Sequence, residues 1–150
     1  MHVPGCTLCE ADGGRVILCN EQLRVVLVEG SEAEAYPGFC RVIWNDHIKE
    51  MSDLNVSERA TLMQAVFTVE SALRVQLQPE KINLASLGNM TPHLHWHVIP
   101  RYRDDATYPQ PIWAVPDKLR ASRNGPLAAE QAAQLTKAIR DTLSTPQNII

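Results

Sequence analysis

The stretch His93-Leu94-His95-Trp96-His97-Val98-Ile99-Pro100 lies past the middle of the chain and predicts a β-strand. Side chains two positions apart on a strand point to the same face, so His93, His95 and His97 are expected to line one face of a sheet. The interleaved apolar residues would then anchor the opposite face in a core. Imidazole has an unperturbed pKa of about 6.5, which lets it act near neutral pH as a ligand, a base or a nucleophile. The chemistry of the protein is therefore expected on this strand.

This strand is expected to pair with the strand before it in a hairpin around Met90. Antiparallel pairing through such a turn places Asn83 opposite His97 and Ala85 opposite His95. The small Ala85 would leave room above His95 for a substrate group, and the Asn83 amide could donate or accept a hydrogen bond there. Runs of apolar and β-branched residues predict strands over 15–20, 23–29, 39–45, 81–87 and 93–100, with a loop over 30–38.

Two amphipathic helices are expected. The first begins near Asn55, which with Glu58 resembles a capping box, although Ser57 is a competing cap, and it ends at the next proline. The segment 101–125 is rich in proline and charge, so it is expected to be irregular. A last helix is expected over 126–144, with a proline in its first turn and a stripe of Ala, Leu and Ile.

The composition fits a single folded α+β domain over residues 1–150. A chain of 150 residues buries about 68–70 % of its unfolded surface without cross-links. The formal charge of −3 and the pI near 5.9 leave no basic patch for nucleic acid. No apolar run is long enough to span a membrane, and the start of the chain lacks the pattern of a secretory leader. We therefore expect a cytoplasmic protein whose partners include neither nucleic acid nor a membrane.

The 4 cysteines are expected to be reduced in that compartment. The close pair Cys6 and Cys9 therefore indicates a metal site or a redox site, whereas Cys19 and Cys40 are expected as small core residues. Arg101 directly follows the histidine strand. It either belongs to a solvated loop or lies within reach of a phosphate. Core or interface positions, rather than platforms for stacked bases, are expected for Trp44, Trp96 and Trp113.

The pattern His93-Leu94-His95-Trp96-His97-Val98-Ile99 resembles the His-x-His-x-His-x-x signature of the histidine-triad superfamily of nucleotide hydrolases and transferases. The resemblance extends from Cys6-Thr7-Leu8-Cys9 through Pro37-Gly38 to the strand of Asn83, while the tail after about Tyr102 is particular to this branch. It implies an antiparallel sheet of about five strands with one long helix packed on it, to which the periodicity adds a C-terminal helix. It also implies a homodimer.

The same resemblance implies a reaction. It makes His95 the nucleophile that attacks the α-phosphorus of a nucleoside 5′-phosphoryl compound and forms a nucleotidyl-histidine, which water then hydrolyses. A neutral imidazole can attack with one nitrogen if its other nitrogen is fixed by an acceptor such as a backbone carbonyl. Dinucleoside polyphosphates, nucleoside phosphoramidates and adenylates all present this phosphorus. The implied supporting positions are His97 for the phosphoryl oxygens, Asn83 near the ribose and phosphate, the amides of Gly88 and Asn89, and Glu29 for the ribose.

A structural zinc site is implied as well. Members of the family with an N-terminal CxxC resemble this chain in joining the two thiolates to two histidines, which here are Cys6, Cys9, His47 and His93. Two sulfur and two nitrogen ligands complete a closed tetrahedral shell. Zinc would thus take His93 and leave His95 and His97 for catalysis.

Three departures from the family pattern leave alternative functions open. Phe39 follows Pro37-Gly38 where many relatives have a histidine of the active site, Asn89-Met90 stand where relatives often have Gln followed by Ser or Thr, and Trp44 replaces a frequent proline. The missing histidine favours, as one alternative, a nucleotide-binding or regulatory protein without turnover. The other alternative is a metal-dependent hydrolase in which the three histidines hold a catalytic ion.

Overall fold

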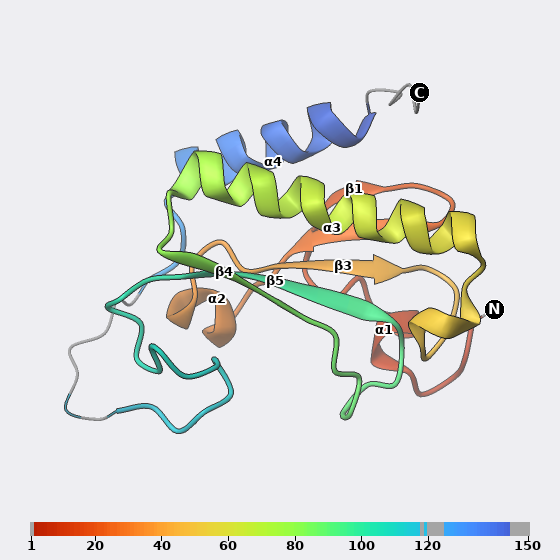
Figure 1. The fold of residues 1–150 in the computed structure, drawn as a ribbon, viewed down its shortest axis with the longest axis horizontal. Coiled ribbons are helices and arrows are strands. Elements are labelled where there is room, and N and C mark those ends of the chain that lie inside the picture. The colour runs from red at the N-terminus through yellow and green to blue at the C-terminus, as the bar shows by residue number, and fades with distance from the viewer. Residues whose placement is uncertain (1, 118, 120–124, 145–150) are drawn as a thin grey trace.

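A five-stranded antiparallel sheet forms the centre of the computed structural model, which describes residues 2–117, 119 and 125–144. The strand order is β1-β2-β3-β5-β4, and α3 and α4 cover one face (Figure 1). The strands are β1 Arg15–Cys19, β2 Leu23–Leu27, β3 Cys40–Trp44, β4 Lys81–Ala85 and β5 His95–Arg101. The helices are α1 Thr7–Glu10, α2 Ser31–Ala35, α3 Val56–Leu77 and α4 Ala129–Ser144, with a 3-10 turn over Met51–Asp53. The expected α+β fold is confirmed.

The long helix begins and ends where its local sequence predicts. The Asn55 side chain accepts a hydrogen bond from the Glu58 amide at 3.0 Å, and the Glu58 carboxylate accepts one from the Asn55 amide at 2.8 Å. This reciprocal capping box identifies Asn55, not Ser57, as the cap. At the other end Gln78 adopts a left-handed conformation before Pro79, which stops the helix.

The core lies between the sheet and the two long helices. α3 presents one buried apolar stripe and α4 another, and both pack against the alternate residues of β2, β3 and β5. The main members of this core are Val25, Val42, Val98, Leu62, Val66, Val69, Leu73, Leu135 and Ile139. Burying these side chains drives folding, since each fully buried one contributes about 1.5–3 kcal/mol. Trp44 and Cys40 lie in the core as expected, whereas Cys19 is exposed at the end of edge strand β1, so that expectation is wrong.

The pairing of the last two strands differs from the prediction by two residues. Asn83 lies opposite Ile99, and Ala85 lies opposite His97 rather than His95. The cause is non-local: Leu94 leaves β5 to donate to the Ile48 carbonyl at 2.6 Å, so the connection is longer than a turn around Met90. A shift of two residues keeps every side chain on its predicted face.

The loop expected over 30–38 contains α2, and α1 and the 3-10 turn were not expected. The short helices α1 and α2 and the segment 102–117 lie on the side of the sheet away from α3 and α4 (Figure 1). Among the described residues, short segments cover the histidine-bearing face of the sheet, whereas the two long helices cover the other face. Of the segment 101–125, which was expected to be irregular, residues 118 and 120–124 lie outside the described residues.

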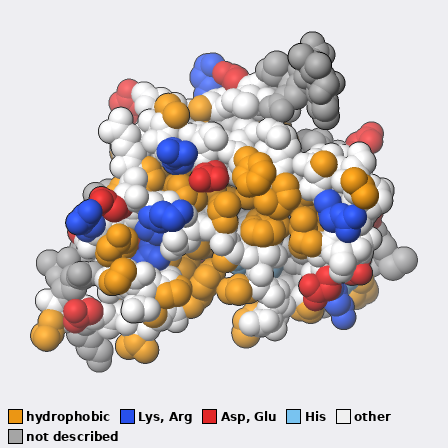
Figure 2. Space-filling model, viewed as in Figure 1, with side chains coloured by type: hydrophobic (Ala, Val, Ile, Leu, Met, Phe, Trp, Pro, Cys, Tyr) orange, Lys and Arg blue, Asp and Glu red, His pale blue; other side chains and the backbone are white. Residues whose placement is uncertain are grey.

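One face of the molecule carries a cluster of hydrophobic side chains. Figure 2 shows them gathered over its middle, where Figure 1 draws α3 and β4. On α3, Val56, Phe67 and Val75 are the large apolar side chains with substantial exposure. None of the helices in the described part of the chain is both long and apolar enough to cross a bilayer.

Candidate functional site

A cleft of about 590 Å³ lies on the histidine-bearing face. His95 and His97 of β5 line it together with Arg41 of β3, Asn89 of the 86–94 connection and Trp113. This volume falls within the range of small-molecule sites, about 300–1,000 Å³. The cleft is therefore large enough for a nucleotide.

His95 is held in one tautomer by its own strand. Its Nδ1 lies 2.6 Å from the His93 carbonyl oxygen, which can only accept, so Nδ1 carries the proton and Nε2 the free lone pair. Burial lowers the pKa of His95, the bond to the His93 carbonyl raises it, and the charge of Arg41 lowers it further. The net result is a neutral imidazole with Nε2 available for attack.

His97 lies beside His95, with ring centroids 4.7 Å apart and the rings nearly perpendicular. Burial first, then His95 and Arg41, lowers the pKa of His97 to about 3. Its Nδ1 is buried and has no hydrogen-bond partner among the described residues. A neutral ring with an unused polar atom is suited to a polar ligand group.

Four side chains near the N-terminus form a cluster that could hold a metal ion. The ligand atoms of Cys6, Cys9, His47 and His93 all lie within 4.8 Å of one another. His93 Nδ1 is 3.4 Å from the Cys6 sulfur and 3.6 Å from the Cys9 sulfur, and His47 Nδ1 is 3.5 Å from the Cys9 sulfur. Bonds of about 2.0–2.3 Å in a tetrahedron require ligand atoms about 3.3–3.8 Å apart, so the spacing fits a zinc ion.

The tautomer of His93 also fits a metal ligand. Its Nε2 is 2.6 Å from the Trp44 carbonyl oxygen and must donate to it, which leaves the Nδ1 lone pair facing the two sulfurs. Burial is the largest cause that lowers the pKa of His93, and a neutral ring is the form that binds metals.

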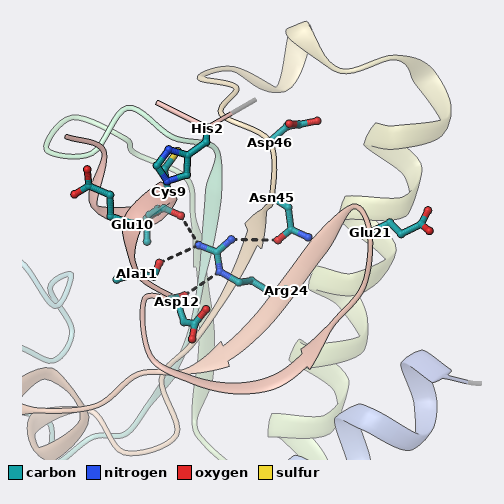
Figure 3. Close-up of a pocket in the computed structure, with 10 residues that line it drawn as sticks. His2, Cys9, Glu10, Ala11, Asp12, Glu21, Arg24, Asn45 and Asp46 are labelled. Carbon is teal, nitrogen blue, oxygen red and sulfur yellow. Dashed lines mark hydrogen bonds between the residues drawn. The ribbon is translucent and has the colours of Figure 1, made fainter. Parts of the chain in front are cut away.

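Arg24 of β2 ties the segment that carries Cys6 and Cys9 to the sheet (Figure 3). Its guanidinium donates to the carbonyl oxygens of Leu8, Ala11 and Asp12 at 2.6, 3.3 and 3.0 Å, and to the Asn45 side chain at 3.1 Å. The Leu8 carbonyl lies in α1, and those of Ala11 and Asp12 follow its end, where helix carbonyls lack intrahelical partners. A nearly buried arginine thus replaces solvent at the end of α1 and fixes the segment that carries Cys6 and Cys9.

The HIT domain profile matches residues 15–104, which is more than half of the chain. This chain belongs to the HIT domain family. The match covers all five strands, α3, His93 and the two histidines of β5, whereas Cys6 and Cys9 lie before it. A comparison with curated proteins gives no match.

Solved structures of HIT proteins share the fold. A histidine triad protein from Bradyrhizobium japonicum is 25% identical, with a TM-score of 0.68, over 88% of this chain and 92% of that chain. A histidine triad protein from Marinobacter aquaeolei is 22% identical, with a TM-score of 0.67, over 88% and 90%. A histidine triad family protein from Mycobacterium smegmatis, described as zinc-bound, is 21% identical, with a TM-score of 0.62, over 92% and 95%.

Two of the residues expected in the HIT active site do not line this cleft. Asn83 is not among the residues that line the cleft, and its side-chain oxygen accepts from Arg101 Nη1 at 2.7 Å. Glu29 lines a separate pocket with Gly38 and Pro126. Gly88 and Asn89 do line the cleft. The structure therefore groups His95, His97, Gly88 and Asn89, and leaves Asn83 and Glu29 outside the group.

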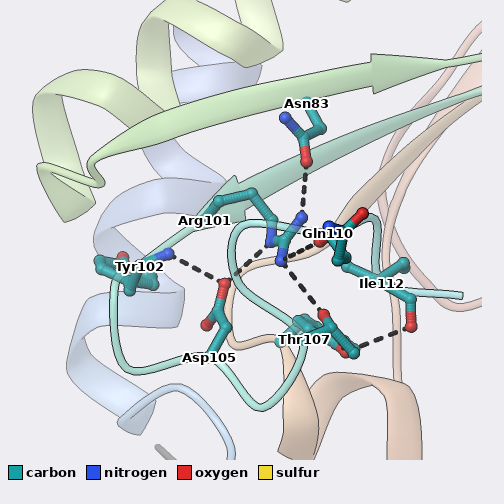
Figure 4. A network of polar contacts seen from close by, with 8 residues as sticks. Asn83, Arg101, Tyr102, Asp105, Thr107, Gln110 and Ile112 are labelled. Carbon is teal, nitrogen blue, oxygen red and sulfur yellow. Dashed lines mark hydrogen bonds and ion pairs between the residues drawn. The ribbon is translucent and has the colours of Figure 1, made fainter. Parts of the chain in front are cut away.

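Arg101 is the centre of a buried polar network rather than part of a solvated loop (Figure 4). Arg101 is 2% exposed and Asp105 is not exposed, and Arg101 Nε donates to the Asp105 carboxylate at 2.8 Å. The guanidinium also donates to the Thr107 hydroxyl at 3.2 Å and to the Gln110 carbonyl at 2.9 Å. The expectation of a solvated loop is wrong for Arg101 and Asp105, because the segment folds back onto the sheet and buries this pair, whereas Arg103 and Asp104 are exposed.

Trp113 and Arg41 are among the cleft residues that the sequence interpretation missed. Trp113 is 48% exposed and lies edge-on to His97, with centroids 5.2 Å apart, so of the two expected positions, core or interface, it does not take the core one. No local pattern marks it, because it belongs to an irregular segment placed by the Arg101 network. Arg41 did leave a trace: it is the one charged residue in the apolar run of β3.

Proposed function

We propose that this HIT protein is a nucleotide hydrolase or nucleotidyl transferase that acts at the α-phosphorus of a nucleoside 5′-phosphoryl compound. The observation that carries the proposal is the bond from His95 Nδ1 to the His93 carbonyl, which leaves Nε2 as the free nucleophilic nitrogen in the cleft. Substrates of this class are dinucleoside polyphosphates, nucleoside phosphoramidates and adenylates.

In the proposed reaction His95 Nε2 forms a bond to phosphorus as the bond from phosphorus to the leaving group breaks. The ring becomes cationic, and its Nδ1–H bond to the His93 carbonyl stabilises that charge. Water then attacks phosphorus, the P–N bond breaks, and the nucleoside monophosphate leaves with the neutral imidazole restored. His97 and the amides of Gly88 and Asn89 would bind the phosphoryl oxygens, since this reaction depends mainly on positioning and charge stabilisation.

We propose that zinc occupies the cluster of Cys6, Cys9, His47 and His93 as a structural ion. The donor set, the spacing of the ligand atoms and the tautomer of His93 support this assignment. A closed shell of four protein ligands has no open position for a substrate, so zinc would supply stability rather than chemistry.

We also propose that residues 1–150 form a single HIT domain that pairs as a homodimer. Edge strand β4 and the exposed Phe67 and Val75 of α3 support this assembly, because unpaired strand edges and apolar patches favour association. Light scattering after size-exclusion chromatography should give twice the mass of the chain, 16.7 kDa.

The test of the reaction is release of nucleoside monophosphate from diadenosine polyphosphates, adenosine phosphoramidate and a lysyl-linked adenylate. The wild type should release product from at least one of them, and His95→Ala should not, while its melting temperature stays unchanged. His2→Ala, which alters an exposed histidine outside the cleft, is the matched control. Equal turnover in His95→Ala and the wild type would reject the mechanism.

The second candidate is a HIT protein that binds nucleotides without turnover. Phe39 favours it: the ring is 1% exposed and packs 5.5 Å from the ring of His97, where relatives often have a further active-site histidine. A stable complex with a nucleotide, without product from any compound of the panel, would support this candidate. The geometry opposes a catalytic metal held by the three histidines, because the Nδ1 lone pair of His93 faces the sulfurs of Cys6 and Cys9.

A further inference from the structure

Arg41 is the one lysine or arginine among the described residues that line the cleft. A nucleoside phosphoryl compound brings negative charge into the cleft, and more charge develops on the phosphoryl oxygens during transfer. His95 and His97 are both buried and next to each other, so the two rings do not supply fixed positive charge to the resting site. The permanent cation of the cleft is therefore Arg41.

The pairing of the strands places Arg41 at the reacting end of the sheet. Arg41 lies directly opposite His97 in the β3–β5 ladder, so their side chains emerge side by side on the same face. The adjacent residue of that face on β3, Ile43, lies opposite His95. Arg41 is thus the direct cross-strand neighbour of His97 and the diagonal neighbour of His95.

The guanidinium of Arg41 also lies close to Phe39, the residue that stands where many relatives have a histidine. Its central carbon lies 5.2 Å from the centroid of the Phe39 ring, and that ring lies 5.5 Å from the ring of His97. A cation over an aromatic face is held in place without using its N–H groups. Phe39 therefore acts as a support that directs Arg41 toward His97.

Two further contacts hold Arg41 and leave it capable of binding an anion. Nη1 donates to the Gly13 carbonyl at 3.1 Å and Nη2 to the Glu32 carboxylate at 2.6 Å. A guanidinium has five N–H groups, so three have no partner among the described residues. The side chains of Arg41 and Glu32 are 19% and 43% exposed, so this ion pair is partly solvated and the guanidinium can accept an additional anion.

Gly13 is suited to this arrangement because no other residue fits there. Its φ is +83°, and a Cβ would lie 2.8 Å from Leu8 Cδ2 and 3.1 Å from Ile43 Cδ1. The left-handed backbone lets the Gly13 carbonyl reach the arginine while the chain passes close to the sheet. The loop before β1 is therefore built to orient Arg41.

We propose that Arg41 binds the phosphoryl oxygens of the substrate and stabilises the charge that develops there, and that it is a catalytic residue of this chain. This inference rests on the proposed nucleotide reaction. In it, Arg41 compensates for the histidine that Phe39 replaces. Arginine suits the role because its fork can donate two hydrogen bonds to one phosphate.

The test compares AMP with adenosine as ligands, by calorimetry, in the wild type, Arg41→Met and Arg41→Lys. Arg41→Met should weaken AMP binding by roughly 10- to 100-fold, the range for losing hydrogen bonds to a charged group, and leave adenosine binding within about twofold. Arg41→Lys, which keeps a point charge, should give an intermediate loss. Circular dichroism must show unchanged folding, and Arg74→Met, on the exposed surface of α3, is the matched control.

Glu32→Gln separates phosphate binding from a purely structural role. If Arg41 served only to pair with Glu32, Glu32→Gln would weaken AMP binding as much as Arg41→Met. The proposal requires AMP binding in Glu32→Gln to stay equal or become tighter, because the guanidinium loses a competing anion. Equal AMP affinity in Arg41→Met and the wild type, or no AMP binding by the wild type, would overturn the proposal.

The two proposals fail in different ways. Turnover that depends on His95 but is unchanged in Arg41→Met would reject the role of Arg41 and keep the reaction. AMP binding that depends on Arg41, with no turnover of any compound in the panel, would reject the reaction and keep Arg41 as a phosphate-binding residue.

Discussion

His95 and His97 differ in one contact, and that contact separates their chemistry. Both rings emerge from β5 onto the same face, and both are nearly buried. His95 Nδ1 has the His93 carbonyl as an acceptor, whereas His97 Nδ1 has no partner among the described residues. Burial lowers the pKa of both rings, but the His93 carbonyl favours the cationic form of His95, and no such acceptor favours the cationic form of His97. This difference suits a nucleophile that becomes positive during the reaction beside a neighbour that stays neutral.

The buried His97 predicts that folding stability falls in acid. Its pKa is about 3 in the folded protein and about 6.5 in the unfolded chain, so between these values only the unfolded state binds the proton. Stability is then full above about pH 6.5 and decreases as the pH falls toward 3, by at most about 1.4 kcal/mol per pH unit. Urea unfolding of the wild type and His97→Gln at pH 7.5 and 5.5 tests this.

The variant should lose less stability between the two pH values than the wild type. The difference between the two proteins isolates His97, because His47 and His93 are present in both. Identical losses would contradict the predicted protonation of His97.

At the level of elements, the sequence predicts what local chemistry determines. The capping box of α3 involves residues within four positions of each other, so the start of this helix could be predicted. The register of β4 with β5 could not, because it depends on the bond from Leu94 to Ile48, far away in the chain. The place of Arg41 beside His97 likewise depends on the β3–β5 pairing.

The position of the segment 102–117 also could not be predicted from local sequence. Its position depends on the buried pair of Arg101 and Asp105, and removing one partner of such a pair costs about 3–5 kcal/mol. We expect Asp105→Asn to lower the free energy of unfolding by an amount in this range, as measured by urea titration.

Glu80→Gln is the matched control for Asp105→Asn. It makes the same carboxylate-to-amide change in the pair Arg103–Glu80, whose 2.6 Å contact is as short but exposed to solvent. This control should leave the stability nearly unchanged. A similar, small effect of both substitutions would show that burial of the Arg101 network does not hold the segment.

At the scale of the whole molecule, the cluster of Cys6, Cys9, His47 and His93 lies next to the cleft. Thr7 and Leu8, between the two cysteines, line the cleft, and the Thr7 hydroxyl lies 3.2 Å from that of Thr91 in the connection before β5. His93 belongs to both sites, since its ring faces the cysteines and its carbonyl holds His95. An ion in the cluster would therefore fix the nucleophile without touching a substrate.

Removal of the metal is accordingly expected to lower stability and turnover together. A strong chelator, or Cys6→Ser, should reduce the melting temperature by about 10 °C or more, since each kcal/mol shifts a domain of this size by about 2–4 °C. Turnover should fall in parallel as His93 and its carbonyl become less ordered, and either Zn²⁺ or Cd²⁺ should restore both in the chelated wild type, because the ion acts only by holding its ligands. Cys19→Ser, which alters an exposed cysteine outside the cluster, is the matched control and should change neither. Turnover lost at an unchanged melting temperature would instead place the ion in the reaction, and an unchanged melting temperature with unchanged turnover would show that the cluster holds no structural metal.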